Sequence, residues 1–112
     1  MVYYDGGCSA KLGTGGYIGW RNNACIGGEY KYYGSLCNTN NQAECKALID
    51  ALNWIVSLKL PKSVPIVLRG DSNLIYSFMT GQAKPTNSKL VEGIHIAKTI
   101  VRNQLKGYKI HF

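Results

Sequence analysis

The sequence has 112 residues, of which 46% are hydrophobic and 11% aromatic, and this length and composition predict one globular domain over residues 1–112. They exclude intrinsic disorder and a fibrous repeat, and no apolar run approaches the ~20 residues that a membrane-spanning helix needs. Thirteen Lys and Arg against six Asp and Glu give a net charge of +7, which favours an anionic partner, nucleic acid first, over a merely solubilising surface charge.

The first third of the chain is rich in glycine and tyrosine and predicts an antiparallel meander of three short strands. The strands are expected over residues 1–5, 17–21 and 24–36. Gly6-Gly7 ends the first strand in this interpretation, and Asn22-Asn23 forms the turn between the second and the third. Tyr30, Tyr32 and Tyr33 could stack on nucleic-acid bases, but packing within the strand is favoured.

The rest of the chain predicts helices that alternate with two further strands. Helical spacing of apolar residues runs from Asn41 to about Leu58, with N-cap candidates at Thr39, Asn40 and Asn41. A buried strand over 66–68, a short helix over 73–79 closed by Gly81, a helix over 88–105 and a last strand over 108–112 follow. In the helix over 88–105, the residues expected to point inward are Leu90, Val91, Ile94, Ala97, Ile100 and Val101. This order predicts an α/β domain with a mixed sheet.

Three of the six acidic residues lie where solvated acids are not expected. Asp5 and Asp71 each close a predicted strand, and Glu44 lies four residues before Leu48 on the apolar stripe of its helix. The other acids are expected on solvent-exposed faces: Glu29, Asp50 and Glu92. If the two strands are neighbours, all three carboxylates meet at one edge of the sheet.

Three carboxylates in one place repel each other unless cations neutralise them. Oxygen ligands without histidine or cysteine suit Mg²⁺ or Mn²⁺, and in a basic protein they suggest two-metal chemistry on a phosphodiester. The alternative interpretation is structural. Aspartate favours turns, and acids favour the first turn of a helix.

Three segments of the sequence resemble type 1 ribonuclease H. They are Tyr3-Tyr4-Asp5-Gly6-Gly7 with Gly15-Gly16-Tyr17, then Thr39-Asn40-Asn41-Gln42-Ala43-Glu44, then Leu68-Arg69-Gly70-Asp71-Ser72. The resemblance runs from Val2 to Phe112. It implies a ribonuclease H-like fold: a five-stranded mixed sheet, three strands antiparallel and then parallel ones, flanked by helices.

The resemblance also implies metal-dependent endonucleolytic cleavage of the RNA strand of an RNA/DNA hybrid. Asp5, Glu44 and Asp71 match catalytic, metal-binding carboxylates of the family. Asn40 and Asn41 match positions that touch the RNA strand, where an amide can donate to and accept from a 2′-hydroxyl. The residues expected to contact nucleic acid are Gly6, Gly7, Thr39, Asn40, Asn41 and Ser72.

The sequence departs from the family at its C-terminal end. The family has a fourth carboxylate on a helix after the last strand, and usually a histidine before it. The chain ends at Phe112, so the predicted domain is C-terminally short and a reduced activity stays open. Glu92 lies before the last strand, and His111 lies inside it, so neither replaces the missing group.

Three alternatives follow for function and assembly. The chain is an enzyme, a non-catalytic nucleic-acid-binding module or ribonucleoprotein subunit, or a domain completed by a partner. A monomer is favoured over a dimer or a partner chain covering the last strand. The N-terminus lacks the layout of a signal peptide. The spacing of the four cysteines does not favour a zinc site, and we expect them to be reduced thiols in an intracellular protein. No membrane partner is expected.

Overall fold

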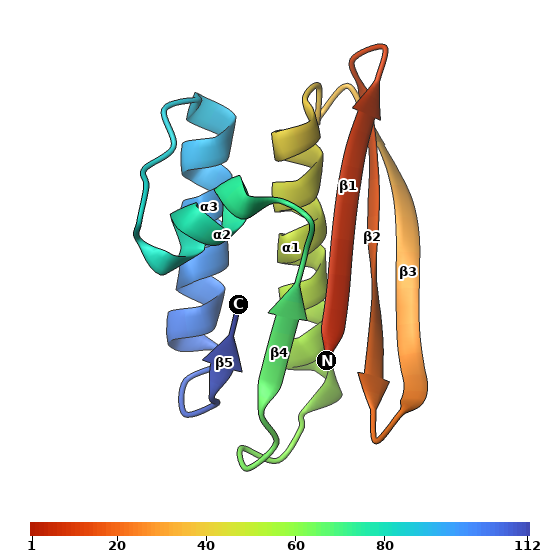
Figure 1. Cartoon of the computed structure of the whole chain (residues 1–112), viewed down its shortest axis with the longest axis vertical. Helices are drawn as coiled ribbons and strands as arrows, with labels where there is room; N and C mark the ends of the chain where they lie inside the picture. Colours follow the sequence, from red (N-terminus) through yellow and green to blue (C-terminus); the bar gives the residue numbers. More distant parts are fainter.

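The computed structural model describes residues 1–112, and its elements follow the predicted order of three strands, a helix, a strand, two helices and a strand. Figure 1 shows them as β1 (Val2–Ser9), β2 (Leu12–Arg21), β3 (Ala24–Gly34), α1 (Asn40–Leu58), β4 (Ile66–Arg69), α2 (Asn73–Thr80), α3 (Ser88–Asn103) and β5 (Ile110–His111).

The five strands build one sheet in the order β3-β2-β1-β4-β5. β1, β2 and β3 are antiparallel, whereas β1 pairs with β4 and β4 with β5 in parallel. This confirms the predicted mixed α/β sheet. Since Val2 pairs with Leu68 and Tyr3 with Arg69, it also confirms that the strands before Asp5 and Asp71 are neighbours.

The first two strands are longer than predicted because they continue through their glycines. β1 runs past Gly6 and Gly7 to Ser9, and β2 starts at Leu12 rather than at residue 17. A Cβ atom on Gly15 would lie 2.7 Å from the Tyr33 ring and 3.2 Å from the Ala47 side chain. Glycine therefore serves here to let β2 approach its neighbours, not to end a strand.

The predicted turn at Asn22-Asn23 is confirmed, with φ of 53° and 65° at the two residues. Two consecutive positive φ angles are typical of the tight turn that joins antiparallel strands.

The helices begin and end close to their predicted bounds. Thr39 is the N-cap of α1, and its side chain accepts a hydrogen bond from the Gln42 N–H at 3.2 Å. Gly81 closes α2 as predicted, with a φ of 81°. α3 ends at Asn103, two residues early, and the last strand is only Ile110–His111.

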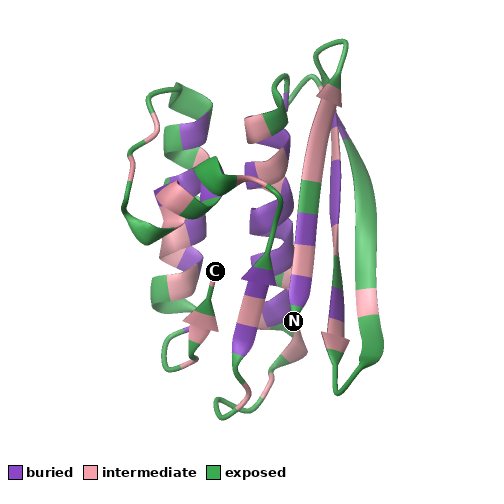
Figure 2. Ribbon diagram, viewed as in Figure 1, coloured by how far each residue is buried: buried purple, intermediate pink, exposed green.

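The core lies between the sheet and the two long helices. In Figure 1, α1 lies behind β1 and β4, with α3 beside it, and Figure 2 shows that the buried residues gather along α1 and the strands in front of it. The largest fully buried side chains are Leu48, Leu52, Leu68 and Ile75. Most of β3 is exposed. None of the helices combines the length and apolarity that crossing a membrane requires.

Several single-residue predictions were wrong. Val91 is 47% exposed, so α3 buries a narrower stripe than expected. Asp50 is buried, because it accepts hydrogen bonds from the Tyr33 hydroxyl at 2.9 Å and the Lys46 ammonium at 3.2 Å. Tyr30 and Tyr32 are 73% and 69% exposed, whereas only Tyr33 packs inside.

Candidate active site

The two aspartates lie on neighbouring parallel strands. Asp5 is in the middle of β1 and is exposed, and its Oδ1 accepts a hydrogen bond from the Gly6 N–H at 3.0 Å. Asp71 follows the end of β4 by two residues and is also exposed. Because β1 and β4 are paired, the two aspartates come close enough for both charges to act on the Tyr3 hydroxyl.

Glu44 comes near these aspartates from the first turns of α1 and is half-buried, as its position on the apolar stripe predicted. Its Oε2 atom is buried and has no hydrogen-bond partner. Burial raises the pKa of the Glu44 carboxyl, and the nearby charges of Asp5 and Asp71 raise it further. A hydrogen bond with Ser72 acts in the opposite direction.

Ser72 links this acid to the next helix. It is the N-cap of α2, where its hydroxyl oxygen accepts a hydrogen bond from the Ile75 N–H at 3.2 Å. Accepting that bond leaves the hydroxyl proton available to the Glu44 carboxylate. The predicted nucleic-acid contact at Ser72 therefore also has a structural function.

Tyr3 is a residue of the site that the sequence analysis missed. Its hydroxyl donates a short hydrogen bond to Oδ1 of Asp71. The pKa of Tyr3 is raised to about 12, and this bond is the largest cause. Burial and the charges of Asp71, Asp5 and Glu44 contribute less. One hydroxyl thus lies in the field of all three acids. The available signal was its spacing, since residues i and i+2 of a strand share a face and Tyr3 precedes Asp5 by two.

The three acids are not gathered into a metal-binding cluster in this conformation: no group of three or more His, Cys, Asp or Glu side chains could hold a metal ion. Their chemistry nevertheless suits a hard divalent cation. They offer only carboxylate oxygens, and one of these, Glu44 Oε2, is buried without a partner. The chemistry of these three donors therefore suits Mg²⁺ or Mn²⁺.

The residues predicted to contact nucleic acid surround the start of α1. Thr39 and Asn40 are exposed and Asn41 is half-buried. Asn40 Oδ1 accepts a hydrogen bond from the Cys8 N–H at 2.7 Å, which ties the start of α1 to the end of β1 beyond Gly7. Its amide nitrogen remains free to donate.

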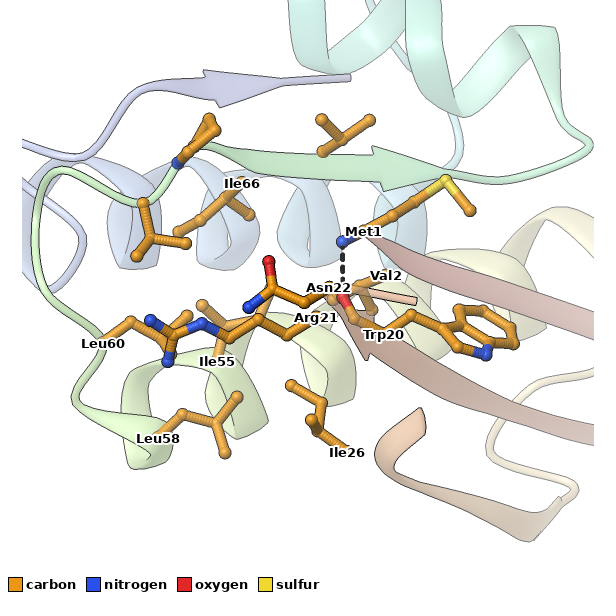
Figure 3. Close-up of a pocket in the computed structure, with 13 residues that line it drawn as sticks. Met1, Val2, Trp20, Arg21, Asn22, Ile26, Ile55, Leu58, Leu60 and Ile66 are labelled. Atoms are coloured by element: carbon orange, nitrogen blue, oxygen red, sulfur yellow. Dashed lines mark hydrogen bonds between the residues drawn. The ribbon is translucent and has the colours of Figure 1, made fainter. Parts of the chain in front are cut away.

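Two of the hollows in the structure lie beside β1 and β2, and one of them adjoins Asp5. Tyr3 and Asp5 line an open hollow of about 530 Å³ whose floor includes Gly16, Gly27 and Gly28. The other is a mostly apolar cavity of about 220 Å³ (Figure 3). It is lined by Val2, Ile55 and Ile66 among others, beside the hydrogen bond from the Met1 amino group to the Trp20 carbonyl at 2.8 Å. None of the three acids lines that cavity, so it is separate from the candidate site.

Comparison with protein families identifies one match, a family described as reverse transcriptase-like, over residues 3–112. A ribonuclease H from Janthinobacterium sp. (strain Marseille) is 34% identical over 79 residues, which are 66% of this chain and 47% of that protein. The chain thus spans about half the length of this curated relative.

Solved structures give a likeness over nearly the whole chain. RNase H1 from the halophilic archaeon Halobacterium salinarum superposes with a TM-score of 0.81 at 26% identity, over 98% of this chain and 79% of that chain. LC11-RNase H1, isolated from compost by a metagenomic approach, was solved in complex with an RNA/DNA hybrid. It matches with a TM-score of 0.84 at 26% identity, over 99% of this chain and 83% of that chain.

Proposed function

Because the chain belongs to the reverse transcriptase-like family and has the fold of type 1 ribonuclease H, we propose that it is a metal-dependent endonuclease that cleaves the RNA strand of RNA/DNA hybrids. Its relatives are named ribonuclease H, and one of them binds such a hybrid. The net charge of +7 provides the attraction that a polyanionic substrate needs.

One observation carries the catalytic part of this proposal: the buried, unpartnered Oε2 of Glu44 between two exposed aspartates. A buried carboxylate oxygen without a donor costs free energy, of the order of 1–3 kcal/mol. The hydrogen bond with Ser72 does not reach this oxygen. A divalent cation would satisfy this oxygen and cancel the repulsion that raises the pKa of Glu44.

In this proposal Asp5, Glu44 and Asp71 hold Mg²⁺ or Mn²⁺. A bound pair of such ions supplies activation of water and stabilisation of the leaving oxygen in phosphodiester hydrolysis. The chain's own residues bind and orient the substrate. Thr39, the exposed N-cap of α1, is proposed to contact a phosphate of the DNA strand.

The asparagines at the start of α1 would distinguish RNA from DNA. Asn40 keeps its amide N–H groups free while its oxygen bonds Cys8, so it can donate to a 2′-hydroxyl from a fixed position. Asn41 adds a second amide beside it. Gly7, where a Cβ atom would meet nothing within 4 Å, leaves β1 without a side chain where the hybrid would approach, whereas Gly6 admits the backbone of α1.

The experiment is cleavage of an end-labelled RNA/DNA hybrid beside duplex RNA, with Mg²⁺, with Mn²⁺ and with a chelator. We expect metal-dependent cutting of the hybrid alone, lost in Asp71→Asn. Glu92→Gln, the same change of an exposed acid on α3, is the matched control and should cut like the parent chain. Cutting that survives in Asp71→Asn would contradict the assignment of the acids.

The second candidate is a nucleic-acid-binding module without catalysis. The observation that favours it is the net charge of +7, which attracts a polyanion without any metal ion. Tight, salt-sensitive hybrid binding that a chelator does not change, with no cleavage, would support it over the enzyme.

A further inference from the structure

Asp71 lies in a stretch that neither helix nor strand holds in place. Residues 70–72 connect the end of β4 to the start of α2, and the Asp71 side chain is exposed. The structure gives its carboxylate one hydrogen bond, from the Tyr3 hydroxyl, and no salt bridge. Without that bond nothing specifies the direction of this carboxylate.

Tyr3, in contrast, is anchored firmly. It is half-buried in β1, in the middle of the sheet, where it pairs with Ile18 of β2 on one side and with Arg69 of β4 on the other. Its ring lines the same hollow as Asp5. The hydroxyl therefore presents a fixed donor beside the acids.

Electrostatics makes such a donor necessary. The charges of Glu44 and Asp71 act on each other, since Asp71 contributes to raising the pKa of Glu44, and an exposed side chain such as Asp71 can relieve that repulsion by turning toward water. The Gly6 N–H holds the carboxylate of Asp5 by a hydrogen bond, whereas only the Tyr3 hydroxyl holds the carboxylate of Asp71. A neutral hydroxyl holds the carboxylate without cancelling the negative charge that a cation needs.

We infer that Tyr3 is a positioning residue, whose hydroxyl holds one oxygen of Asp71 and so keeps the other available to a divalent cation beside Asp5. The inference rests on the proposed metal-dependent function. It adds a residue that touches neither the cation nor the substrate and that acts through Asp71. Groups that hydrogen-bond a metal ligand in this way typically change metal affinity about 10- to 100-fold when they are removed.

The test is Tyr3→Phe, which removes the hydroxyl and keeps the ring. Calorimetric titration of the protein with Mn²⁺, without nucleic acid, should show affinity weaker by about 10- to 100-fold. In the cleavage assay, the Mn²⁺ concentration for half-maximal rate should rise by the same factor, while the rate at saturating Mn²⁺ is largely retained. A merely structural role would not separate these two quantities.

Tyr17→Phe is the matched control. It also removes a hydroxyl that bonds a carboxylate, Glu29 at 3.4 Å. Tyr17 and Glu29 line the same hollow as Tyr3 and Asp5, but Glu29 is not one of the three acids assigned to the cation, so metal affinity should not change. Thermal unfolding of both variants checks that the fold is kept. If the parent chain binds no Mn²⁺, the proposed function and this inference both fall. If the parent chain binds Mn²⁺ and Tyr3→Phe binds it equally well or more tightly, only the inference is overturned.

Discussion

Gly6 of β1 lies against α1 so closely that a Cβ atom on it would sit 2.5 Å from the backbone nitrogen of Glu44. Strand and helix therefore touch backbone to backbone at the point where they present Asp5 and Glu44. The neighbouring Gly7 has open space instead, since a Cβ atom there would meet nothing within 4 Å. The fold therefore has no room for a side chain at Gly6 but has room for one at the adjacent Gly7.

Gly6→Ala is expected to destabilise the fold by about 1–3 kcal/mol, because the methyl group meets backbone and α1 must move. Gly7→Ala should change the free energy of unfolding by no more than about 0.5 kcal/mol, or slightly stabilise. Urea unfolding of both variants measures the difference. Equal free energies for the two variants would contradict the contact between β1 and α1.

Glu44→Gln should abolish cleavage and stabilise the protein at neutral pH. Burial raises the pKa of Glu44, so the folded state favours its protonated form, and stability falls as the pH rises through the raised pKa. We expect a gain at pH 7 of about 1 kcal/mol, or roughly 4–8 °C in the melting temperature.

The pH dependence separates this explanation from a general packing effect. Near pH 4, about the ordinary pKa of a glutamate, the parent chain carries a protonated Glu44 and the stabilisation should disappear. Melting curves from pH 4 to pH 7 measure the difference between the two chains. A constant difference over this range would show that desolvation of the Glu44 charge is not its cause.

The fold could be predicted from the sequence because hydrophobic periodicity and turn residues act locally. The helical stripe through Leu48 and Leu52 and the glycine after α2 gave the element order and nearly the right helix bounds. The strand ends predicted from the glycines of β1 and β2 were wrong, because both strands continue through these glycines. Their role is to admit α1 and Tyr33, and such tertiary contacts leave no local signal.

The site could be predicted in part for the same reason. Spacing on α1 indicated Glu44, and the position after β4 indicated Asp71. Asp5 was identified although it lies inside β1 and not, as predicted, at the end of that strand. Tyr3 was missed because its hydroxyl meets Asp71 across 68 positions of the sequence. Asp50 was misplaced because a buried tyrosine hydroxyl and Lys46 satisfy its carboxylate, and hydrophobic patterning does not register such partners.

A divalent cation should stabilise the parent chain. If only the folded state binds Mn²⁺, a concentration of 100 times the dissociation constant adds about 2.7 kcal/mol to the free energy of unfolding. Asp71→Asn should lose most of this gain, whereas Glu92→Gln on the exposed face of α3 should keep it. Differential scanning calorimetry with Mn²⁺ and with a chelator measures both. A gain that is the same in Asp71→Asn would place the bound cation elsewhere.

Asn40 makes a prediction that separates recognition from folding. Its Oδ1 holds the Cys8 N–H, and its N–H groups are free. Asn40→Asp keeps the acceptor, so the melting temperature should hardly change. It removes the donor and adds a negative charge. We expect hybrid affinity to fall by roughly 1.4–2.8 kcal/mol, which is about ten- to a hundredfold.

Fluorescence anisotropy in chelator, with an RNA/DNA hybrid and a DNA duplex, measures this loss without cleavage. Asn22→Asp adds the same charge at the β2–β3 turn, where Asn22 has a φ of 53° that aspartate also adopts. Asn22→Asp should lower the affinity for the hybrid and for the DNA duplex slightly and equally. Asn40→Asp should lower the affinity for the hybrid more than the affinity for the DNA duplex, because only the hybrid has a 2′-hydroxyl that the lost donor could bind. Equal losses for the two ligands would reduce Asn40 to a structural link between α1 and β1.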